Sequence, residues 1–247
     1  MIYKTKGIVL RVVKYGETSM IASVYTEAFG MQSYIINGVR KQQKTNKIGL
    51  LQPGAILELE AYHQENKNLQ RLKDFQWATV YQNLLSDVIK NSILTYLVEL
   101  FYNALKQPEA NPSLFYFFED SLLFLDQADS TVSANFSLYF SIQLPQFFGF
   151  KIEPITHSFS EEKEMYIDLL EGCFVEEKPN HSHYLDNNLT SVINDLLKVM
   201  HPSELIELKI NKATRKKLLV AFQQYYALHL PDFGWLKSFA ILQEVLS

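Results

Sequence analysis

Three short apolar stretches follow one another near the start of the chain: Ile8–Tyr15 (IVLRVVKY), Ser19–Thr26 (SMIASVYT) and Met31–Val39 (MQSYIINGV). Each is rich in β-branched or aromatic residues and has a glycine at or near its end, which is typical of strands joined by tight turns. Two further stretches, Ile56–Tyr62 and Leu69–Val80, complete a set of five predicted strands. Five short antiparallel strands favour a small closed barrel over a sandwich, because closure removes the exposed sheet edges.

The spacing of apolar residues becomes helical after residue 80. Apolar pairs recur three to four residues apart between Leu84 and Leu105, which predicts a long amphipathic helix. Residues 151–187 lack a clear period, and we expect an irregular insertion there. The predicted fold class is therefore α+β, with an N-terminal five-stranded barrel in residues 1–78 and an otherwise all-helical domain in residues 79–247. Further helices are predicted at Leu114–Leu125, Phe136–Phe148, Ser191–Met200, Pro202–Leu208, Thr214–Leu230 and Gly234–Leu246, with Thr190 or Ser191, Ser203 and Thr214 as N-caps.

The charge is divided unevenly along the 247 residues. Residues 1–77 carry 11 Lys and Arg against 6 Asp and Glu, a net charge of +5. The remaining residues carry 12 against 21, a net charge of −9. This asymmetry points to nucleic acid as the partner of the basic part. The acidic part repels DNA and is better suited to contacts with partner proteins. With 47% hydrophobic residues the composition excludes a disordered chain.

Signals for an enzyme, a metal site or a membrane segment are absent. The chain has no P-loop, GxSxG, HExxH or GxGxxG motif. Its single cysteine, Cys173, with His181 and His183 offers either a nucleophile and base or three metal ligands, against ordinary loop residues. We favour the ordinary loop and expect no catalytic residue, cofactor or metal. The start of the chain lacks the apolar core of a signal peptide, so we expect a cytoplasmic protein without a membrane partner.

The strongest functional signal is a basic stretch between the third and fourth predicted strands. It contains Arg40, Lys41, Lys44 and Lys47. Single-strand binding surfaces combine a positive groove for phosphates with flat rings on which bases stack. The alternative is that the lysines solvate a loop and the tyrosines fill the barrel core. Other cations on or beside the strands are Lys4, Lys6, Arg11, Lys14, Arg71 and Lys73, and the interleaved rings are Tyr3, Tyr15, Tyr25, Tyr34 and Tyr62.

Longer segments resemble the RecO family of bacterial recombination mediators. Residues 4–30 (KTKGIVLRVVKYGETSMIASVYTEAFG), 36–41 (INGVRK) and 50–60 (LLQPGAILELE) are similar to the amino-terminal barrel of that family. Residues 215–242 (RKKLLVAFQQYYALHLPDFGWLKSFAIL) resemble its closing helices. The resemblance implies an oligonucleotide-binding (OB) barrel followed by a helical domain.

The resemblance also implies a function without catalysis. RecO proteins bind single- and double-stranded DNA, anneal complementary strands and, with RecR, help RecA to displace single-stranded-DNA-binding protein. Arg40, Lys41, Lys44 and Lys47 match the basic barrel loop, and we add Lys6, Arg11 and Lys14 as candidate DNA contacts. Many members carry a four-cysteine zinc module, but only Cys173 is present here, so the zinc is not expected.

A second implied partner is the acidic tail of single-stranded-DNA-binding protein, which ends in apolar residues. RecO-like proteins capture this tail on the helical domain. A binding site needs an apolar groove and cations at its rim. We expect the aromatic residues of Phe136–Phe148 to supply the groove, and Arg215, Lys216 and Lys151 to supply the cations. Two readings remain open beside the mediator: a protein-interaction scaffold whose barrel does not bind DNA, and a hydrolase built around Cys173.

Overall fold

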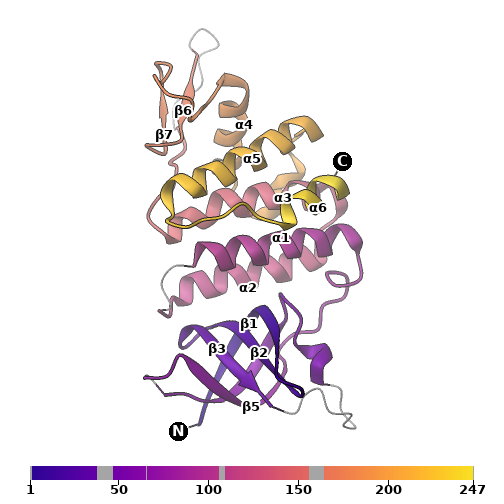
Figure 1. The fold of residues 1–247 in the computed structure, drawn as a ribbon. Coiled ribbons are helices and arrows are strands. Elements are labelled where there is room, and N and C mark those ends of the chain that lie inside the picture. The colour runs from indigo at the N-terminus through magenta and orange to yellow at the C-terminus, as the bar shows by residue number, and fades with distance from the viewer. Residues whose placement is uncertain (1, 38–46, 65, 106–108, 156–163, 247) are drawn as a thin grey trace. The chain divides into compact units, whose positions relative to one another are not determined.

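The computed structural model describes residues 2–37, 47–64, 66–105, 109–155 and 164–246 (Figure 1). By their internal contacts the residues form two compact units, one of residues 1–85 and 105–126 and one of residues 86–104 and 127–247. The boundary at residues 78 and 79 stays a prediction, and the contacts place residues 105–126 with the barrel although they follow that boundary.

The first unit contains the predicted five-stranded barrel, which confirms the α+β fold class. The strands close in the order β1-β2-β3-β5-β4, and every neighbouring pair is antiparallel except β3 with β5, which are parallel. A short 3₁₀ helix, η1 (Lys47–Leu50), precedes β4. The strands are β1 (Ile2–Tyr15), β2 (Ser19–Thr26), β3 (Gly30–Ile36), β4 (Ile56–Tyr62) and β5 (Leu69–Trp77).

Closure of the barrel depends on the long strand β1. Its first half, Ile2–Ile8, pairs with β4, and its second half, Gly7–Tyr15, pairs with β2. A bulge between Val9 and Arg11 lies just after the pairing with β4 ends, and most of the pairing with β2 follows it. Such a bulge bends and twists the strand, which lets one strand serve two neighbours.

Side chains alternate between the inside and the outside of the barrel. Tyr34 is fully buried, and loss of solvent raises the pKa of its hydroxyl to about 12. Side chains therefore fill the closed interior in the described part of the barrel. The buried core is made of Val9, Ala22, Val24, Tyr34, Ile36, Leu51, Ala55, Leu57, Leu59, Ala61, Leu72 and Phe75.

Helix α2 (Pro112–Gln127) packs with the barrel in the first unit. The Tyr25 hydroxyl of β2 donates to the Asn111 carbonyl, just before the helix begins. At the other end, the buried Asp126 carboxylate accepts hydrogen bonds from the backbone N–H groups of residues 82–84. These contacts fix both ends of α2 to residues that precede it by more than 40 positions.

The second unit is mainly helical (Figure 1). Helix α3 packs against α1, α4 and α5, and α6 packs against α1. Residues 151–187, predicted to be irregular, contain a small sheet of order β7-β6-β8. The elements are α1 (Val88–Ala104), α3 (Ser130–Gln143), η2 (Leu144–Phe147), β6 (Tyr166–Asp168), β7 (Cys173–Val175), β8 (Tyr184–Leu185), α4 (Asn187–Lys198), η3 (Pro202–Ile206), α5 (Lys212–His229) and α6 (Ser238–Val245).

The predicted helix caps are wrong by a few residues. Helix α5 is capped by Asn211, whose side chain accepts from the backbone N–H of Thr214, the residue predicted as the cap. Asp186 and His201 cap the two preceding helical segments in the same way. None of the helices in the described part of the chain combines the length and the apolar character that crossing a bilayer requires.

Gly7 gives a direct test of the barrel. A Cβ atom at this position would lie 2.6 Å from Val24 Cγ1 and 2.8 Å from Leu59 Cδ1, inside the core. We expect Gly7→Ala to lower the free energy of unfolding by about 1–3 kcal/mol, because overpacking forces these side chains from their places. Gly49→Ala, where no atom lies within 4 Å, is the control and should change it by less than about 1 kcal/mol. Equal effects in urea denaturation would show that the interior is packed differently.

Candidate nucleic-acid interface

The register of the strands determines which cationic side chains of the barrel point outward, toward solvent. Residues directly opposite one another on neighbouring strands point to the same side of the sheet. Leu59 and Ala61 of β4 point into the core, so Glu58, Glu60 and Tyr62 point outward. Arg71 lies opposite Tyr62 and Ile35, and Arg11 lies opposite Ser23 after the bulge. Arg11 and Arg71 are therefore outward-facing and exposed.

Two of the outward-facing lysines share one glutamate as their ionic partner. Glu60 lies 3.2 Å from Lys4 Nζ and 2.9 Å from Lys73 Nζ. The hydrogen bonds from Lys73 and from Lys4 hold the pKa of the Glu60 carboxyl below its usual value. Lys4 and Lys73 are thus less available to a phosphate backbone than a cation without an ionic partner.

Lys6 has a different partner, on helix α2. Its Nζ lies 2.9 Å from Glu119 Oε1 and 3.3 Å from Oε2. Only 7% of the Glu119 side chain is exposed, so this carboxylate depends on Lys6 for compensation of its charge. The hydrogen bond from Lys6 to Glu119 raises the pKa of the Lys6 amine. Lys6, predicted as a DNA contact, therefore serves to attach α2 to the barrel.

Four exposed barrel cations have no acidic partner among the residues that the structure describes. They are Arg11, Lys14, Lys67 and Arg71. Arg11 and Lys14 were predicted as DNA contacts. The predicted residues Arg40, Lys41 and Lys44 lie outside the described residues, as does the side chain of Lys47. Their assignment stays a prediction.

Lys14 lies near the end of β3, where the described chain stops at residue 37. Ser19, at the start of β2, contacts Asn37 through its hydroxyl, 3.0 Å from Asn37 Oδ1. Lys14 and Tyr15 precede the β1–β2 turn that leads to Ser19, and residue 37 leads directly into residues 38–46. Asn37, the last described residue before the basic segment, is therefore close to the Lys14 end of β1.

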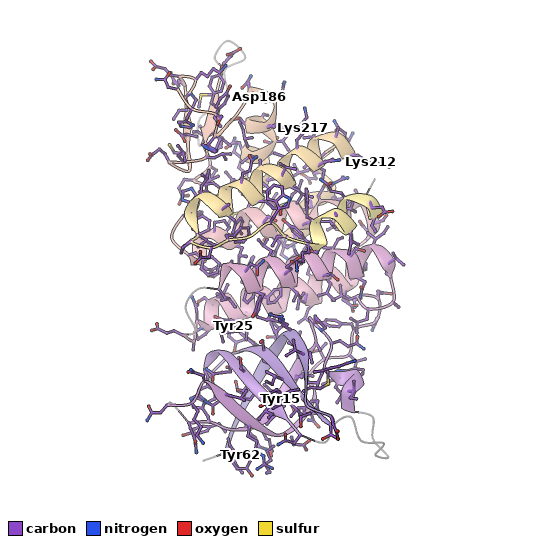
Figure 2. The ribbon with its side chains drawn as sticks, in the orientation of Figure 1. Tyr15, Tyr25, Tyr62, Asp186, Lys212 and Lys217 are labelled. Carbon is purple, nitrogen blue, oxygen red and sulfur yellow. The ribbon has the colours of Figure 1, made fainter. Side chains whose placement is uncertain are left out.

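The five tyrosines that the sequence placed among the cations have different roles. Tyr25 and Tyr34 are fully buried, as the alternative reading expected. Tyr3 packs edge-on against the rings of Phe29 and His63, which stack on each other at 4.0 Å. Tyr15 and Tyr62 are 51% and 40% exposed and make no ring contact or hydrogen bond with the described residues (Figure 2). These two rings remain available to a ligand.

Sequence reasoning left Lys67 and Arg71 out of the predicted contacts. The alternation around Arg71 resembles that around Lys73, and nothing local distinguishes the two residues. The difference is the Glu60 side chain on the neighbouring strand, which reaches Lys73. Only the register of β4 and β5 shows that Lys73, and not Arg71, lies within reach of Glu60.

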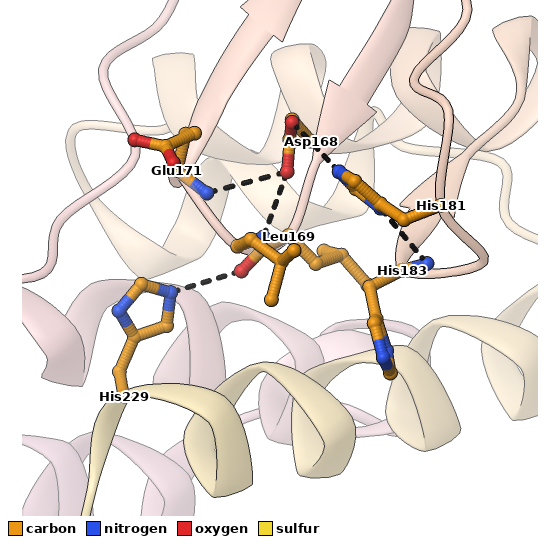
Figure 3. Close-up of polar contacts among 7 residues, drawn as sticks. Asp168, Leu169, Glu171, His181, His183 and His229 are labelled. Carbon is orange, nitrogen blue, oxygen red and sulfur yellow. Dashed lines mark hydrogen bonds and ion pairs between the residues drawn. The ribbon is translucent and has the colours of Figure 1, made fainter.

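The imidazoles of His181 and His229 make structural hydrogen bonds, whereas His183 takes part through its backbone N–H (Figure 3). His181 Nδ1 accepts from the His183 backbone N–H, so its Nε2 carries the proton that reaches Asp168 Oδ2 at 3.1 Å. Burial opposes the charged form of Asp168, but the backbone N–H groups of residues 170 and 171 and His181 outweigh it and lower the pKa of the carboxyl. His229 on α5 contacts the Leu169 carbonyl oxygen at 2.9 Å.

This arrangement gives no support to a reactive thiol. Burial, Asp168 and Glu171 raise the pKa of the Cys173 thiol, whereas nucleophilic cysteines have a lowered pKa. Within the described ranges, no three His, Cys, Asp or Glu side chains are arranged to hold a metal ion. The absence of a catalytic site and of a metal stays a prediction.

The second unit places the predicted partner-binding cations in unlike surroundings. Arg215 and Lys216 line a cavity of about 220 Å³ beside α6, whereas Lys151 is paired with Glu153 at 2.9 Å and does not line it. Phe136, Tyr139 and Phe140 are buried in the core of the unit, so these three rings are not available for the expected groove, whereas Phe147 and Phe148 of the same stretch are half-buried. The apolar residues that line the cavity come from α5 and from α6 with the residue after it. The cavity is lined by Lys212, Ala213, Arg215, Lys216, Leu219, Leu242, Gln243 and Leu246.

Arg215 itself is 8% exposed. Its guanidinium donates to Asn135 Oδ1 from two nitrogens, at 3.3 and 3.1 Å, and to the Ile210 carbonyl at 3.0 Å. No carboxylate pairs with it among the described residues. Gln243 Nε2 is also buried without a hydrogen-bond partner in the described part of the chain. A buried cation and an unpaired N–H group at one cavity favour a ligand that carries a negative charge.

The Lys6–Glu119 contact predicts a stability effect. We expect Lys6→Met to lower the free energy of unfolding by about 1–3 kcal/mol at pH 7, because Glu119 is left buried without its cation. In the parent, the contribution of Lys6 should disappear as the pH rises through its raised pKa, above 10.5, so the two proteins should converge. Lys4→Met, which affects an amine on a largely exposed side chain, should cost less than about 0.5 kcal/mol. Urea denaturation at pH 7 and pH 11 measures these effects, and equal losses for both variants would contradict the assignment.

Comparisons with known proteins agree with this architecture. The family model for the N-terminal part of recombination protein O matches residues 1–81, and the model for its C-terminal part matches residues 85–238. The DNA repair protein RecO of Phocaeicola vulgatus is 34% identical over 247 residues, which cover 100% of both chains. The RecO proteins of Bacteroides fragilis and Flavobacterium psychrophilum are each 32% identical to this chain. Each alignment covers 99% of this chain and 99% of the relative. Full coverage at this level of identity, with both family models matched, shows that the chain belongs to the RecO family of DNA repair and recombination proteins.

Proposed function

We propose that this chain is a DNA-binding recombination mediator that works without catalysis. In this proposal it binds single- and double-stranded DNA, anneals complementary strands and assists RecA loading together with RecR, in the cytoplasm. The curated relatives are named as DNA repair proteins, which supports a role in repair. The alternative of a scaffold with an inert barrel differs in one measurable property, the dependence of DNA affinity on salt.

One observation carries the proposal: the sorting of barrel cations into paired and unpaired groups. Lys4, Lys6 and Lys73 are bonded to carboxylates, whereas Arg11 and Arg71 are exposed without an acidic partner among the described residues. An unpaired cation can approach a phosphate without first breaking an ion pair. We therefore assign DNA contact to Arg11, Lys14, Lys67 and Arg71 together with Arg40, Lys41, Lys44 and Lys47, and leave Lys6 out.

Such a surface suffices for annealing. Two DNA strands repel each other through their phosphates, and cations that neutralise phosphates lower this barrier while condensed counterions are released. No group has to make or break a covalent bond. The interface makes use of charge and shape alone, which agrees with a barrel whose interior is filled by side chains.

The cavity beside α5 and α6 suits the proposed second partner, the acidic tail of single-stranded-DNA-binding protein. Leu219, Leu242 and Leu246 offer an apolar wall for a terminal ring. Arg215 and Gln243 present donors to a carboxylate, and the guanidinium fork is better suited to it than an ammonium. Lys212 and Lys216 are exposed and add positive charge at the rim. Lys151 is left out because Glu153 already binds it.

The DNA proposal is tested by removing the charge of Arg71 and then of Arg11, with Lys73→Gln, on the same β-strand as Arg71, as the matched control. Arg71→Gln should lower the slope of log K against log salt by about 0.7 for single-stranded DNA, because one phosphate contact is lost. Adding Arg11→Gln should bring the total to about 1.4. Lys73→Gln removes the same charge from a lysine already bonded to Glu60 and should leave the slope unchanged.

Fluorescence anisotropy with a labelled oligonucleotide at several salt concentrations provides these slopes. Equal slopes for Arg71→Gln and Lys73→Gln would place the DNA elsewhere. If the parent affinity does not depend on salt, the scaffold reading is correct.

The tail proposal is tested by calorimetry with an acidic peptide that ends in phenylalanine. Lys216→Glu should weaken binding by about tenfold or more, because a like charge then meets the carboxylates at the rim. Lys151→Glu makes the same charge change outside the cavity and should have little effect. Lys216 is exposed, so its variant should keep the fold, unlike a variant of Arg215. Equal losses for both variants, or a parent that does not bind the peptide, would refute the assignment.

A further inference from the structure

Tyr62 lies at the end of β4, where the barrel presents an unusual combination of exposed side chains. Its ring is 40% exposed and points outward. Its two lateral neighbours are Ile2 on β1, which is 42% exposed, and Arg71 on β5. Side chains in such directly opposite positions have Cβ atoms about 4.5–5.5 Å apart. An aromatic ring therefore stands between an aliphatic side chain and a cation, all three open to solvent.

None of these three side chains has a hydrogen bond, ring contact or ion pair within the described structure. Besides the hydrogen bond to Glu60, which is the main cause, the nearby Tyr62 hydroxyl helps to raise the pKa of the Lys73 amine. By contrast, Tyr3 packs with Phe29 and His63 at the same strand ends. Leu69, at the start of β5, is exposed as well. Single exposed apolar side chains are normal, but neighbouring ones bordered by a charged group mark a binding surface, and Tyr62 and Ile2 are such neighbours beside Arg71.

We propose that Tyr62 is the position on which the barrel stacks an unpaired base, and that this ring makes the barrel prefer single-stranded over duplex DNA. This inference rests on the proposed DNA-binding function and adds the feature of DNA that the surface reads. A flat ring next to an arginine matches the base and the phosphate of one nucleotide. Every base offers a π-face, so the contact selects for unpaired structure and not for sequence.

The physical basis of the preference is the accessibility of the base faces. In a duplex each base is stacked between its neighbours, and a ring at the protein surface reaches only the backbone. Phosphates are present on both forms of DNA. Arg71 thus contributes to binding of both forms, whereas Tyr62 contributes only where a base is free.

Three variants separate these contributions. Tyr62→Leu keeps an apolar side chain of moderate size but removes the flat ring, and should weaken binding of a dT oligonucleotide by about five- to a hundredfold. Its salt slope should equal that of the parent, since no phosphate contact is lost. Tyr62→Phe keeps the ring and should bind as the parent does. Arg71→Gln should lower the salt slope for both single-stranded and duplex DNA.

An abasic oligonucleotide of the same length provides a readout that a merely structural role would not change. The parent and Tyr62→Phe should bind the dT strand more tightly than the abasic strand, and Tyr62→Leu should bind both with nearly equal affinity. Duplex affinity should be the same in all three proteins, which also shows that the variants are folded.

The inference is overturned if Tyr62→Leu retains the preference for dT over the abasic strand, or if it loses duplex affinity in the same proportion. Failure of the proposed function looks different: neither Arg71→Gln nor Arg11→Gln would then change the salt slope. The two failures are therefore distinguishable in one set of titrations.

Discussion

The two ladders of strand β1 are the constraint on which the rest of the structure depends. Ile2–Ile8 must pair with β4 and Gly7–Tyr15 with β2, and Gly7 belongs to both because it leaves room for Val24 and Leu59. Once the ladders are in register, each side chain of the barrel is directed either inward or outward. The register brings Glu60 between Lys4 and Lys73, so that the ladders also decide which cations are neutralised.

The charge of the barrel is therefore less informative than its distribution. A net charge of +5 for residues 1–77 describes an average over ion pairs and free cations. The carboxylates of Glu60 and Glu119 hold three lysines, and the other cations among the described barrel residues lie on the second half of β1, in the β4–β5 turn and at the start of β5. The exposed rings of Tyr15 and Tyr62 are on the same barrel, so the proposed DNA surface combines cations with rings.

Local patterns explain what the sequence predicts well. The β-branched runs of β2 and β4 are found with the predicted bounds, because alternation and turn residues are properties of neighbouring positions. The first half of β1 was missed, since Tyr3, Lys4, Thr5 and Lys6 form no apolar run and are held by pairing with β4. The caps of the later helices were misplaced for a related reason, because Asn211 precedes the helical period that identifies α5.

Contacts between distant parts of the chain explain what the sequence does not reveal. Arg215 was predicted as a cation at the rim of a partner groove, yet Asn135, 80 positions earlier, holds its guanidinium in the interior. Lys6 reads like any strand lysine until Glu119 is placed beside it, 113 positions later. Among the tyrosines considered for base stacking, Tyr25 and Tyr34 are buried, whereas Tyr15 and Tyr62 have exposed rings. Candidate sites on this chain are thus decided by which side chains are already engaged.

Ultraviolet crosslinking of an oligo-dT strand to the full chain, with the crosslinked peptides identified by mass spectrometry, tests the central claim most directly. With the crosslinked residue located within each peptide, we expect crosslinks at residues 11–15, 38–47 and 62–71. Crosslinks confined to residues 58–60 of β4, or to the helical unit, would contradict the proposed DNA surface.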